Sequence, residues 1–191
     1  EFSLFGKKLY LSPILDLHSN DLVSYTISDR PVLSMVTTML NEAFAKIPDG
    51  TNLILHSDQG WQYQHKQYQQ MLREKGVRQS MSRKGNCLDN AVIENFFGLL
   101  KSELLYLQEF RSMEHFKLEL IEYLDYYNNR RIKAKLKGLP PAIHRQQALS
   151  AAWTIFTSKY CLTFWGHFTA NGVAYFLLFE RIFVFFETQL I

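Results

Sequence analysis

The sequence predicts an α/β domain in which a mixed β-sheet is flanked by helices. Two strand-like runs joined by a turn open the chain, and short apolar strands then alternate with segments of helical periodicity. The chain has 191 residues, of which 47% are hydrophobic and 20% charged. This composition is ordinary for a globular protein, and the length is sufficient for one sizeable core.

The first two strands are expected at residues 8–17 and 22–27. Both segments are rich in aliphatic, aromatic and β-branched residues. The sequence His18-Ser19-Asn20-Asp21 between them favours a turn, so the pair is typical of an antiparallel hairpin. Pro13 has no amide hydrogen to donate, and it therefore predicts an edge or a bulge in the first strand.

A helix and then a buried strand are expected after the hairpin. Pro31 is predicted to occupy the first position of the helix, because the residues that follow it are apolar at the helical period as far as Pro48-Asp49-Gly50. Residues 52–55 form a short apolar run typical of a strand buried in a sheet. Residues 64–75 then favour a helix that Gly76 ends.

The next part of the chain is predicted to be mainly helical. A short strand at residues 77–80 precedes a basic, glycine-containing loop at 82–86. Asp89 is an N-cap candidate, since its carboxylate can accept a hydrogen bond from a free helical amide, and the helix is expected to run to about Leu105. A further helix is predicted over residues 112–129 from its periodic aromatic and leucine residues.

Positive charge is concentrated in one short stretch. The formal net charge is +3, yet residues 128–147 carry six basic residues and no acidic one. This pattern is typical of a surface that contacts phosphates, and a solvated basic loop is the alternative. The only cysteines, Cys87 and Cys161, have no histidines at metal-binding spacing and imply no disulfide framework, which favours a reducing cytosol.

The character of the chain changes near Leu149. Residues 151–191 contain 12 of the 28 aromatic residues and show no clean period, so an irregular extension is expected there. The apolar run 173–186 is broken by Glu180-Arg181 and is too short to span a bilayer, and no membrane association is expected.

Two acidic residues carry the chemistry that the sequence suggests. Asp58 follows the apolar run 52–55, and Glu94 lies in the first turns of an amphipathic helix, on a stripe away from its apolar face. Carboxylate oxygens are the ligands that Mg²⁺ requires, so the pair indicates metal-dependent phosphoryl transfer. Taken singly, a strand-end aspartate is commonly a turn former and a helical glutamate is commonly solvated.

The motifs around these acids resemble a known family. They are His56-Ser57-Asp58-Gln59-Gly60, Asp89-Asn90-Ala91 followed by Glu94 and Phe96-Phe97, Tyr126 to Lys133, and Leu136 to Pro141. In this order they resemble the transposases of bacterial insertion sequences whose second reading frame encodes a retroviral-integrase-like catalytic core. The resemblance covers residues 1–149, which are expected to form the core, with 150–191 as an atypical C-terminal extension. It implies an RNase H-like fold, two Mg²⁺ or Mn²⁺ ions, and strand transfer of element ends into target DNA.

The resemblance assigns roles to individual residues. Asp58 corresponds to the family's second catalytic aspartate and Glu94 to its glutamate, each as a metal ligand. Asn90, one turn before Glu94, is expected to orient it, and Lys101 to contact DNA phosphate near the active site. The remaining DNA-binding candidates are basic residues of the loop and of the basic stretch, namely Arg83, Lys84, Arg130, Arg131, Lys133, Lys135 and Lys137.

One family feature is not found in these residues. The family's first catalytic aspartate lies a few residues before a Thr-Glu-Phe-like sequence, and Glu1-Phe2 resembles the end of it. We therefore expect that the first strand is largely missing and that this chain is inactive in strand transfer. Asp16 and Asp21 are assigned to the hairpin turn rather than to metal binding. The extension is interpreted as translation beyond a lost stop codon.

Other functions stay open at this point. The main alternative is a non-catalytic DNA- or transposase-binding relic, and a third option is an RNase H-like nuclease that acts on RNA–DNA hybrids. The expected partners are DNA and further copies of the chain or an intact transposase, in the bacterial cytoplasm near the nucleoid. His56 is interpreted as a satisfied strand-end residue. Trp61 and Tyr63 are expected to cap the core beneath the Asp58 loop.

Overall fold

The computed structural model describes residues 1–49, 51–82, 91–150 and 182–185. The strands are β1 (Phe2–Leu4), β2 (Lys7–Asp16), β3 (Leu22–Ser28), β4 (Ile54–Ser57), β5 (Arg78–Met81) and β6 (Ile182–Phe185). The helices are α1 (Leu33–Ala45), α2 (Trp61–Gln64), α3 (Lys66–Lys75), α4 (Ala91–Leu100), the π-helical η2 (Lys101–Leu105), α5 (Met113–Asn129) and the 3₁₀ turn η3 (Ala134–Leu136). Residues 141–150 are also helical.

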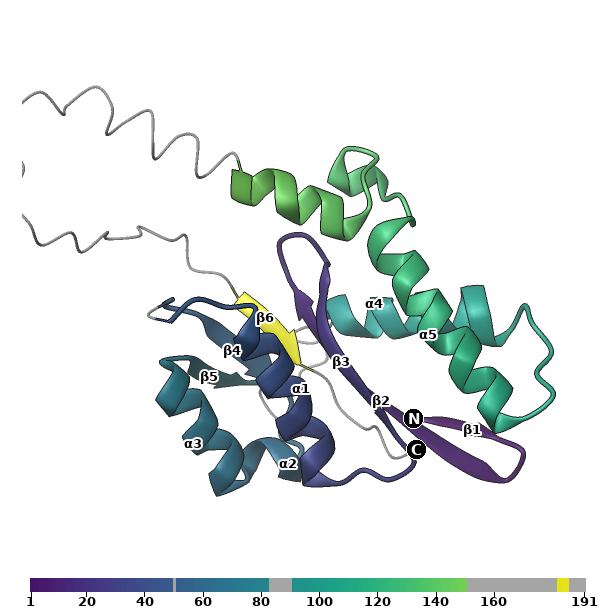
Figure 1. The fold of residues 1–191 in the computed structure, drawn as a ribbon, viewed down its shortest axis with the longest axis horizontal. Coiled ribbons are helices and arrows are strands. Elements are labelled where there is room, and N and C mark those ends of the chain that lie inside the picture. Colours follow the sequence, from purple (N-terminus) through teal and green to yellow (C-terminus); the bar gives the residue numbers. More distant parts are fainter. Residues whose placement is uncertain (50, 83–90, 151–181, 186–191) are drawn as a thin grey trace, which may run out of the picture.

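The strands form one mixed sheet, as the sequence predicts. Its order is β1-β2-β6-β4-β5, and β3 pairs with β2 as well (Figure 1). The strands β1, β3 and β6 all run antiparallel to β2, whereas β4 runs parallel to both β5 and β6. The long strand β2 is therefore the element with which most of the sheet pairs.

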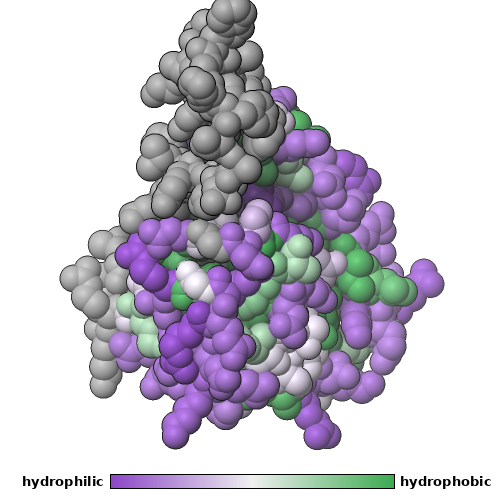
Figure 2. Space-filling model, turned by 60° about the vertical axis from the view of Figure 1, so that its left-hand side comes forward, coloured by the Kyte–Doolittle hydropathy of each residue, from purple (hydrophilic) through white to green (hydrophobic). Residues whose placement is uncertain are grey.

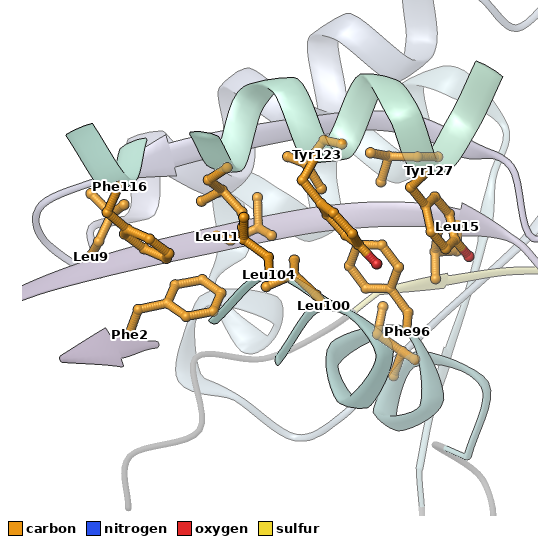
Figure 3. Packing of buried hydrophobic residues seen from close by; sticks show 14 of the residues in the cluster. Phe2, Leu9, Leu11, Leu15, Phe96, Leu100, Leu104, Phe116, Tyr123 and Tyr127 are labelled. Carbon is orange, nitrogen blue, oxygen red and sulfur yellow. The ribbon is translucent and has the colours of Figure 1, made fainter. Parts of the chain in front are cut away.

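Alternation along β2 divides the interior into two cores. Leu9, Leu11 and Leu15 face a core shared with α4, η2 and α5, while Ile14 faces a second core shared with α1, α3 and β4. Successive side chains of a strand point to opposite faces, so one run of apolar residues can supply both cores. Figure 3 shows the first core, in which side chains of β2, α4 and α5 pack together.

Aromatic contacts fix the two ends of the first core. The Phe2 ring meets Phe116 edge-on with centroids 5.2 Å apart, and Phe96 meets Tyr127 in the same way at 4.9 Å (Figure 3). Such edge-to-face pairs are favourable beyond the area that they bury.

The face in Figure 2 is largely hydrophilic, with hydrophobic residues gathered in patches between the polar ones. No helix in the described part is long and apolar enough to cross a membrane.

The strand β1 and its turn were not anticipated beyond the partial strand suggested by Glu1-Phe2. Phe5 and Gly6 connect β1 to β2 with φ values of 53° and 68°, and Leu4 faces Lys7 across the turn. Two consecutive positive φ values are characteristic of the tight hairpin turn that matches strand twist. Glycine supplies one of them without strain, and Phe5 must adopt the other despite its side chain.

Several predicted boundaries differ by a few residues. The first helix begins at Leu33 rather than at Pro31, because Val32 is extended at φ −92° and ψ 156°. The helix predicted at 64–75 is divided at His65, whose ring accepts a hydrogen bond from the amide of Gln67 and caps α3. Gly76 ends α3 in the left-handed conformation at φ 74°, as the sequence predicts.

Two further predictions concern irregular backbone. The register of the β2–β3 ladder shifts between Ile14 and Leu15, and the unmatched residue is Val23 of β3, so the bulge is not in the first strand. Pro13 pairs with Tyr25 and lies outside the registers of β1 and β6, so among the described strands it is at an edge, the other expected alternative. The helix after residue 90 ends at Leu105 as expected, but its last turn is π-helical, since the Tyr106 amide bonds the Lys101 carbonyl at 2.9 Å. The proposed cap Asp89 lies outside the described residues.

The end of α5 is fastened to the first hairpin. The Asn128 side-chain oxygen accepts from the Leu22 amide at 2.7 Å, and its nitrogen donates to the Leu22 carbonyl at 3.3 Å. Arg145 donates to Asp21 at 2.8 Å and lies 3.6 Å from Asp16. Because Asp16 also accepts from Ser19, its carboxylate belongs to the hairpin turn, as the sequence interpretation assigned it.

Replacing Asn128 by alanine should destabilise the fold. In Asn128→Ala the buried Leu22 loses a side-chain donor and acceptor, and the free energy of unfolding should fall by about 1–3 kcal/mol. Asn129→Ala is the matched control, because among the described residues the Asn129 side chain bonds only the exposed Asp125 of the same helix. It should change stability by less than about 0.5 kcal/mol. Urea unfolding measures both, and equal effects would contradict this assignment.

Candidate functional site

Asp58 follows β4 directly and is buried, with 7% of its surface exposed. One carboxylate oxygen, Oδ1, accepts a hydrogen bond from the Gly60 amide at 2.7 Å. The other, Oδ2, is buried and has no hydrogen-bond partner within the described part of the chain. A buried carboxylate oxygen without a donor is costly unless a cation or a ligand satisfies it. Asp58 therefore has one carboxylate oxygen that the described part of the chain leaves available to a ligand.

Gly60 is required for the shape of this loop. A Cβ atom at Gly60 would lie 3.0 Å from Asp58 Oδ1 and 3.2 Å from the Tyr63 ring, which leaves no room for a side chain. The Gly60 backbone itself, at φ −53° and ψ 145°, is accessible to any residue. The constraint is thus close approach to the carboxylate and not backbone conformation. The sequence motif contained this glycine, but only the coordinates give its reason.

The aromatic residues near Asp58 divide between the core and the surface. Tyr63 is 2% exposed and packs edge-on against Tyr68, so it caps the core as expected. Burial, and then the neighbouring Tyr63 and Asp58, raise the pKa of the Tyr68 phenol. The same expectation for Trp61 is wrong, since Trp61 is 56% exposed. Trp61 begins a single helical turn whose inward positions are Gln62 and Tyr63.

His56 lies on β4, two residues before Asp58. Its Nδ1 atom is 2.9 Å from the Ser80 hydroxyl on β5, while its buried Nε2 atom has no hydrogen-bond partner among the described residues. The expectation of a satisfied strand-end histidine therefore holds for one ring nitrogen only. Histidine nitrogens are possible metal ligands, but the described residues contain no group of three or more acidic, histidine or cysteine side chains that could hold a metal.

Glu94 lies in the first turn of α4 and is exposed, on the stripe that the helical period predicts. On another face of the same helix, Ile93 and Phe96 are buried in the core. Lys101 follows two turns later at the start of η2 and is half-buried. Three expected site residues, Arg83, Lys84 and Asn90, lie outside the described residues.

The residues present fit a divalent metal at one identifiable atom. Asp58 Oδ2 is an anionic oxygen, buried beside a loop that the Gly60 amide holds in place. Mg²⁺ and Mn²⁺ prefer carboxylate oxygens, and a cation would supply the partner that this oxygen lacks. The exposed Glu94 carboxylate is the second candidate ligand.

Arg131 of the basic stretch is bound inside the protein. Its guanidinium donates to both oxygens of Glu103 at 2.8 and 2.5 Å, and Glu103 also accepts from Tyr123 at 2.9 Å. The Arg131 hydrogen bonds lower the pKa of Glu103 below its ordinary 4.5. Burial raises the pKa of Tyr123, and the Glu103 hydrogen bond adds to this rise. The bidentate pair joins the end of α5 to η2.

Lys133 and Arg130 also have partners within the protein. Lys133 donates to the Tyr127 hydroxyl at 2.6 Å and lies 4.3 Å from that ring's centroid. Burial, and then the nearby Arg131, lower the pKa of Lys133 from 10.5 to about 8. Arg130 is exposed and donates to Asp125 at 3.3 Å.

Lys135 and Lys137 are exposed, as Arg130 is. The two lysines belong to a small loop closed by the backbone pairing of Lys133 with Leu139, and Leu136 anchors the loop in the interior. Lys137 has a positive φ of 59° and is followed by Gly138 at 74°. Both lysine side chains face solvent, where phosphate groups can reach them.

The Glu103–Arg131 pair should make stability depend on acidic pH. Because the pKa of Glu103 is lower in the folded protein, its contribution is complete above the ordinary 4.5 and is lost as pH falls through the folded-state pKa. Glu103→Gln should cost about 1 kcal/mol near neutral pH and less at acidic pH. Urea unfolding at both pH values measures this, with Glu109→Gln as the exposed control. A loss in Glu103→Gln that does not change with pH would contradict it.

The family comparisons agree with this geometry. Residues 1–87 and 94–149 each match a family model described as an integrase core domain. The putative transposase InsK for insertion sequence element IS150 of Escherichia coli K12 is 56% identical over 147 residues, which are 77% of this chain and 52% of that protein. An uncharacterized transposase-like protein of Haemophilus influenzae is 49% identical over 150 residues, which are 78% of this chain and 69% of that protein.

A solved structure confirms the RNase H-like fold. The HTLV-2 integrase catalytic core domain in complex with magnesium, in a trimeric form, superimposes with a TM-score of 0.54 at 14% identity, covering 73% of this chain and 86% of that one. The chain spans about half the length of the InsK relative. With sequence, family model and fold in agreement, this chain belongs to the insertion-sequence transposases that carry an integrase core domain.

Proposed function

We propose that the chain acts in the strand transfer of insertion-sequence ends into target DNA, with Asp58 and Glu94 as ligands of divalent metal. The observation that carries this proposal is the buried Asp58 Oδ2 atom, which has no hydrogen-bond partner among the described residues. The transposase relatives and the magnesium complex of a similar fold support the same choice of chemistry. A divalent metal bound there would polarise a phosphodiester and activate the attacking hydroxyl.

The protein's own residues would hold and orient the acids and the DNA. The Gly60 amide fixes the Asp58 carboxylate, and the buried Ile93 and Phe96 fix the helix face from which Glu94 projects. Lys101 lies on the same side of that helical segment, two turns after Glu94, where it can bind a phosphate. Asn90 is proposed to orient Glu94, and Arg83 and Lys84 to contact DNA.

DNA binding is proposed to depend mainly on the exposed lysines of the basic stretch. Arg131 and Lys133 are held by Glu103 and Tyr127, so their charge is partly used inside the fold. Lys135 and Lys137 remain exposed, and Arg130 is exposed beside Asp125. Cations that neutralise backbone phosphates give binding that tolerates sequence and weakens with salt.

Strand transfer by these residues is proposed to be weak or absent, because the described residues hold no group of three acidic, histidine or cysteine side chains for a metal. A pair of metal ions commonly shares a third carboxylate, and a vacant ligand position lowers occupancy and misplaces the nucleophile. Incubating the 191-residue chain with element ends and target DNA tests this. Mg²⁺-dependent joining would contradict the proposed inactivity, while salt-sensitive DNA binding without joining agrees with it.

Removing the Asp58 charge should weaken metal binding. Asp58→Asn keeps an oxygen for the Gly60 amide but removes the negative charge, so affinity for Mn²⁺ should fall at least about tenfold. Isothermal titration calorimetry measures this directly. Asp49→Asn is the control, because Asp49 is exposed and, within the described residues, pairs with Lys75 alone. Equal Mn²⁺ affinity in Asp58→Asn and the unmodified chain would refute the metal site.

Removing two exposed lysines should weaken DNA binding and its salt dependence. The double variant Lys135→Ala/Lys137→Ala should lower the slope of log affinity against log salt by about 1–2, since each phosphate contact contributes about 0.9. Fluorescence anisotropy with duplex DNA at several salt concentrations gives this slope. The control double variant Arg111→Ala/Lys117→Ala removes the same charge from two exposed positions, one just before α5 and one within it. It should leave the slope unchanged. Identical slopes in the two double variants would argue against the assignment.

A further inference from the structure

The strand β6 lies at the centre of the sheet although it comes from the C-terminal extension (Figure 1, yellow). On one side it pairs antiparallel with β2, where Leu15 faces Val184 and Asp16 faces Phe183. On the other side it pairs parallel with β4, where Leu55 faces Phe183. Four residues thus connect two strands that both precede residue 60.

The position that β6 fills would otherwise separate the sheet. Among the described strands, β4 pairs only with β5 and β6, so without β6 the parallel β4–β5 ribbon has no ladder to β2. A two-stranded ribbon is marginally stable alone, and the bare edges of β2 and β4 would present unpaired backbone groups. In the complete chain the apolar residues Ile14, Leu15 and Leu55 of these two strands are at most 4% exposed.

We propose that the space between β2 and β4 is a strand-acceptor site and that its occupant is the segment Ile182–Phe185 of the same chain. Strand addition is driven by main-chain hydrogen bonds, so the site selects an extended segment of good strand formers. Ile-Phe-Val-Phe consists entirely of such residues. The 31 residues between Ser150 and Ile182 can span up to ~100 Å when extended, which is ample to reach the site.

The proposed strand addition has a consequence for the candidate site. Asp58 follows β4 by one position, and β4 is aligned with β2 through β6. The extension thereby positions the strand that carries Asp58 against the strand on which both cores are built. This inference does not depend on metal binding or on DNA strand transfer, and the metal titration and the experiments below can fail separately.

A disulfide between opposed positions tests the occupant. Directly opposed residues of antiparallel strands have Cα atoms about 4.5–5.5 Å apart, which suits a disulfide. In a Cys87→Ser/Cys161→Ser background, Leu15→Cys/Val184→Cys should form an intrachain disulfide under mild oxidation. The control Ile14→Cys/Val184→Cys is offset by one residue, which turns the first thiol to the other face of β2, and should cross-link at least about tenfold less.

Non-reducing electrophoresis and mass spectrometry separate the outcomes. An intrachain cross-link specific to the opposed pair is the expected result. No cross-link, or equal cross-linking of the offset pair, would overturn the strand pairing. A cross-linked dimer would show that the acceptor site takes the strand of a second copy, and would overturn the assignment to the same chain.

A proline within β6 tests the contribution of the strand. Val184→Pro removes a main-chain donor from a strand paired on both sides, whereas Val184→Ile keeps it. In hydrogen-exchange measurements, the backbone amides of residues 14–16 and of residues 54–56 should exchange at least about tenfold faster in Val184→Pro than in Val184→Ile. Unchanged exchange there would refute the proposal. If the proline variant does not fold, the disulfide pair still tests whether β6 pairs with β2.

Discussion

The fold depends on a single ten-residue strand with apolar residues on both faces. Three other strands pair with β2, and its alternating side chains enter both hydrophobic cores. A strand buried on both sides must be covered by helices on both sides, which is why α1 and the α4–α5 pair lie on opposite faces (Figure 1). The position of Asp58 follows from this arrangement, since β4 is aligned with β2 through the sheet.

The C-terminal motif of the core has a structural role as well as a proposed DNA-binding one. Tyr127 fills the core, Asn128 binds both backbone groups of Leu22, and Arg131 binds Glu103. Together they fasten α5 to the first hairpin and to η2. Charge alone does not distinguish a cation paired inside the fold from one facing DNA. In the structure Arg131 and Lys133 have partners inside the fold, whereas Arg130, Lys135 and Lys137 are exposed.

Local signals in the sequence were sufficient where short-range chemistry determines structure. Gly76 ends a helix because glycine adopts positive φ without strain, and Pro13 lies where β2 pairs on one side only among the described strands. The helix start at Leu33 and the His65 cap could not be predicted, since each depends on one dihedral or on one side-chain contact. The sheet position of β6 was not predictable either, because its partner strands precede it by more than a hundred residues. At the site, the motif located Asp58, but only coordinates show that one of its oxygens lacks a partner.

Anomalous diffraction from crystals of this chain grown with Mn²⁺ tests the central claim most directly, because it locates a bound metal without reference to activity. The account predicts a manganese peak within about 2.5 Å of Asp58 Oδ2, with a Glu94 carboxylate oxygen at a similar distance. Peaks only elsewhere, with Asp58 and Glu94 directed to separate regions of the surface, would contradict it.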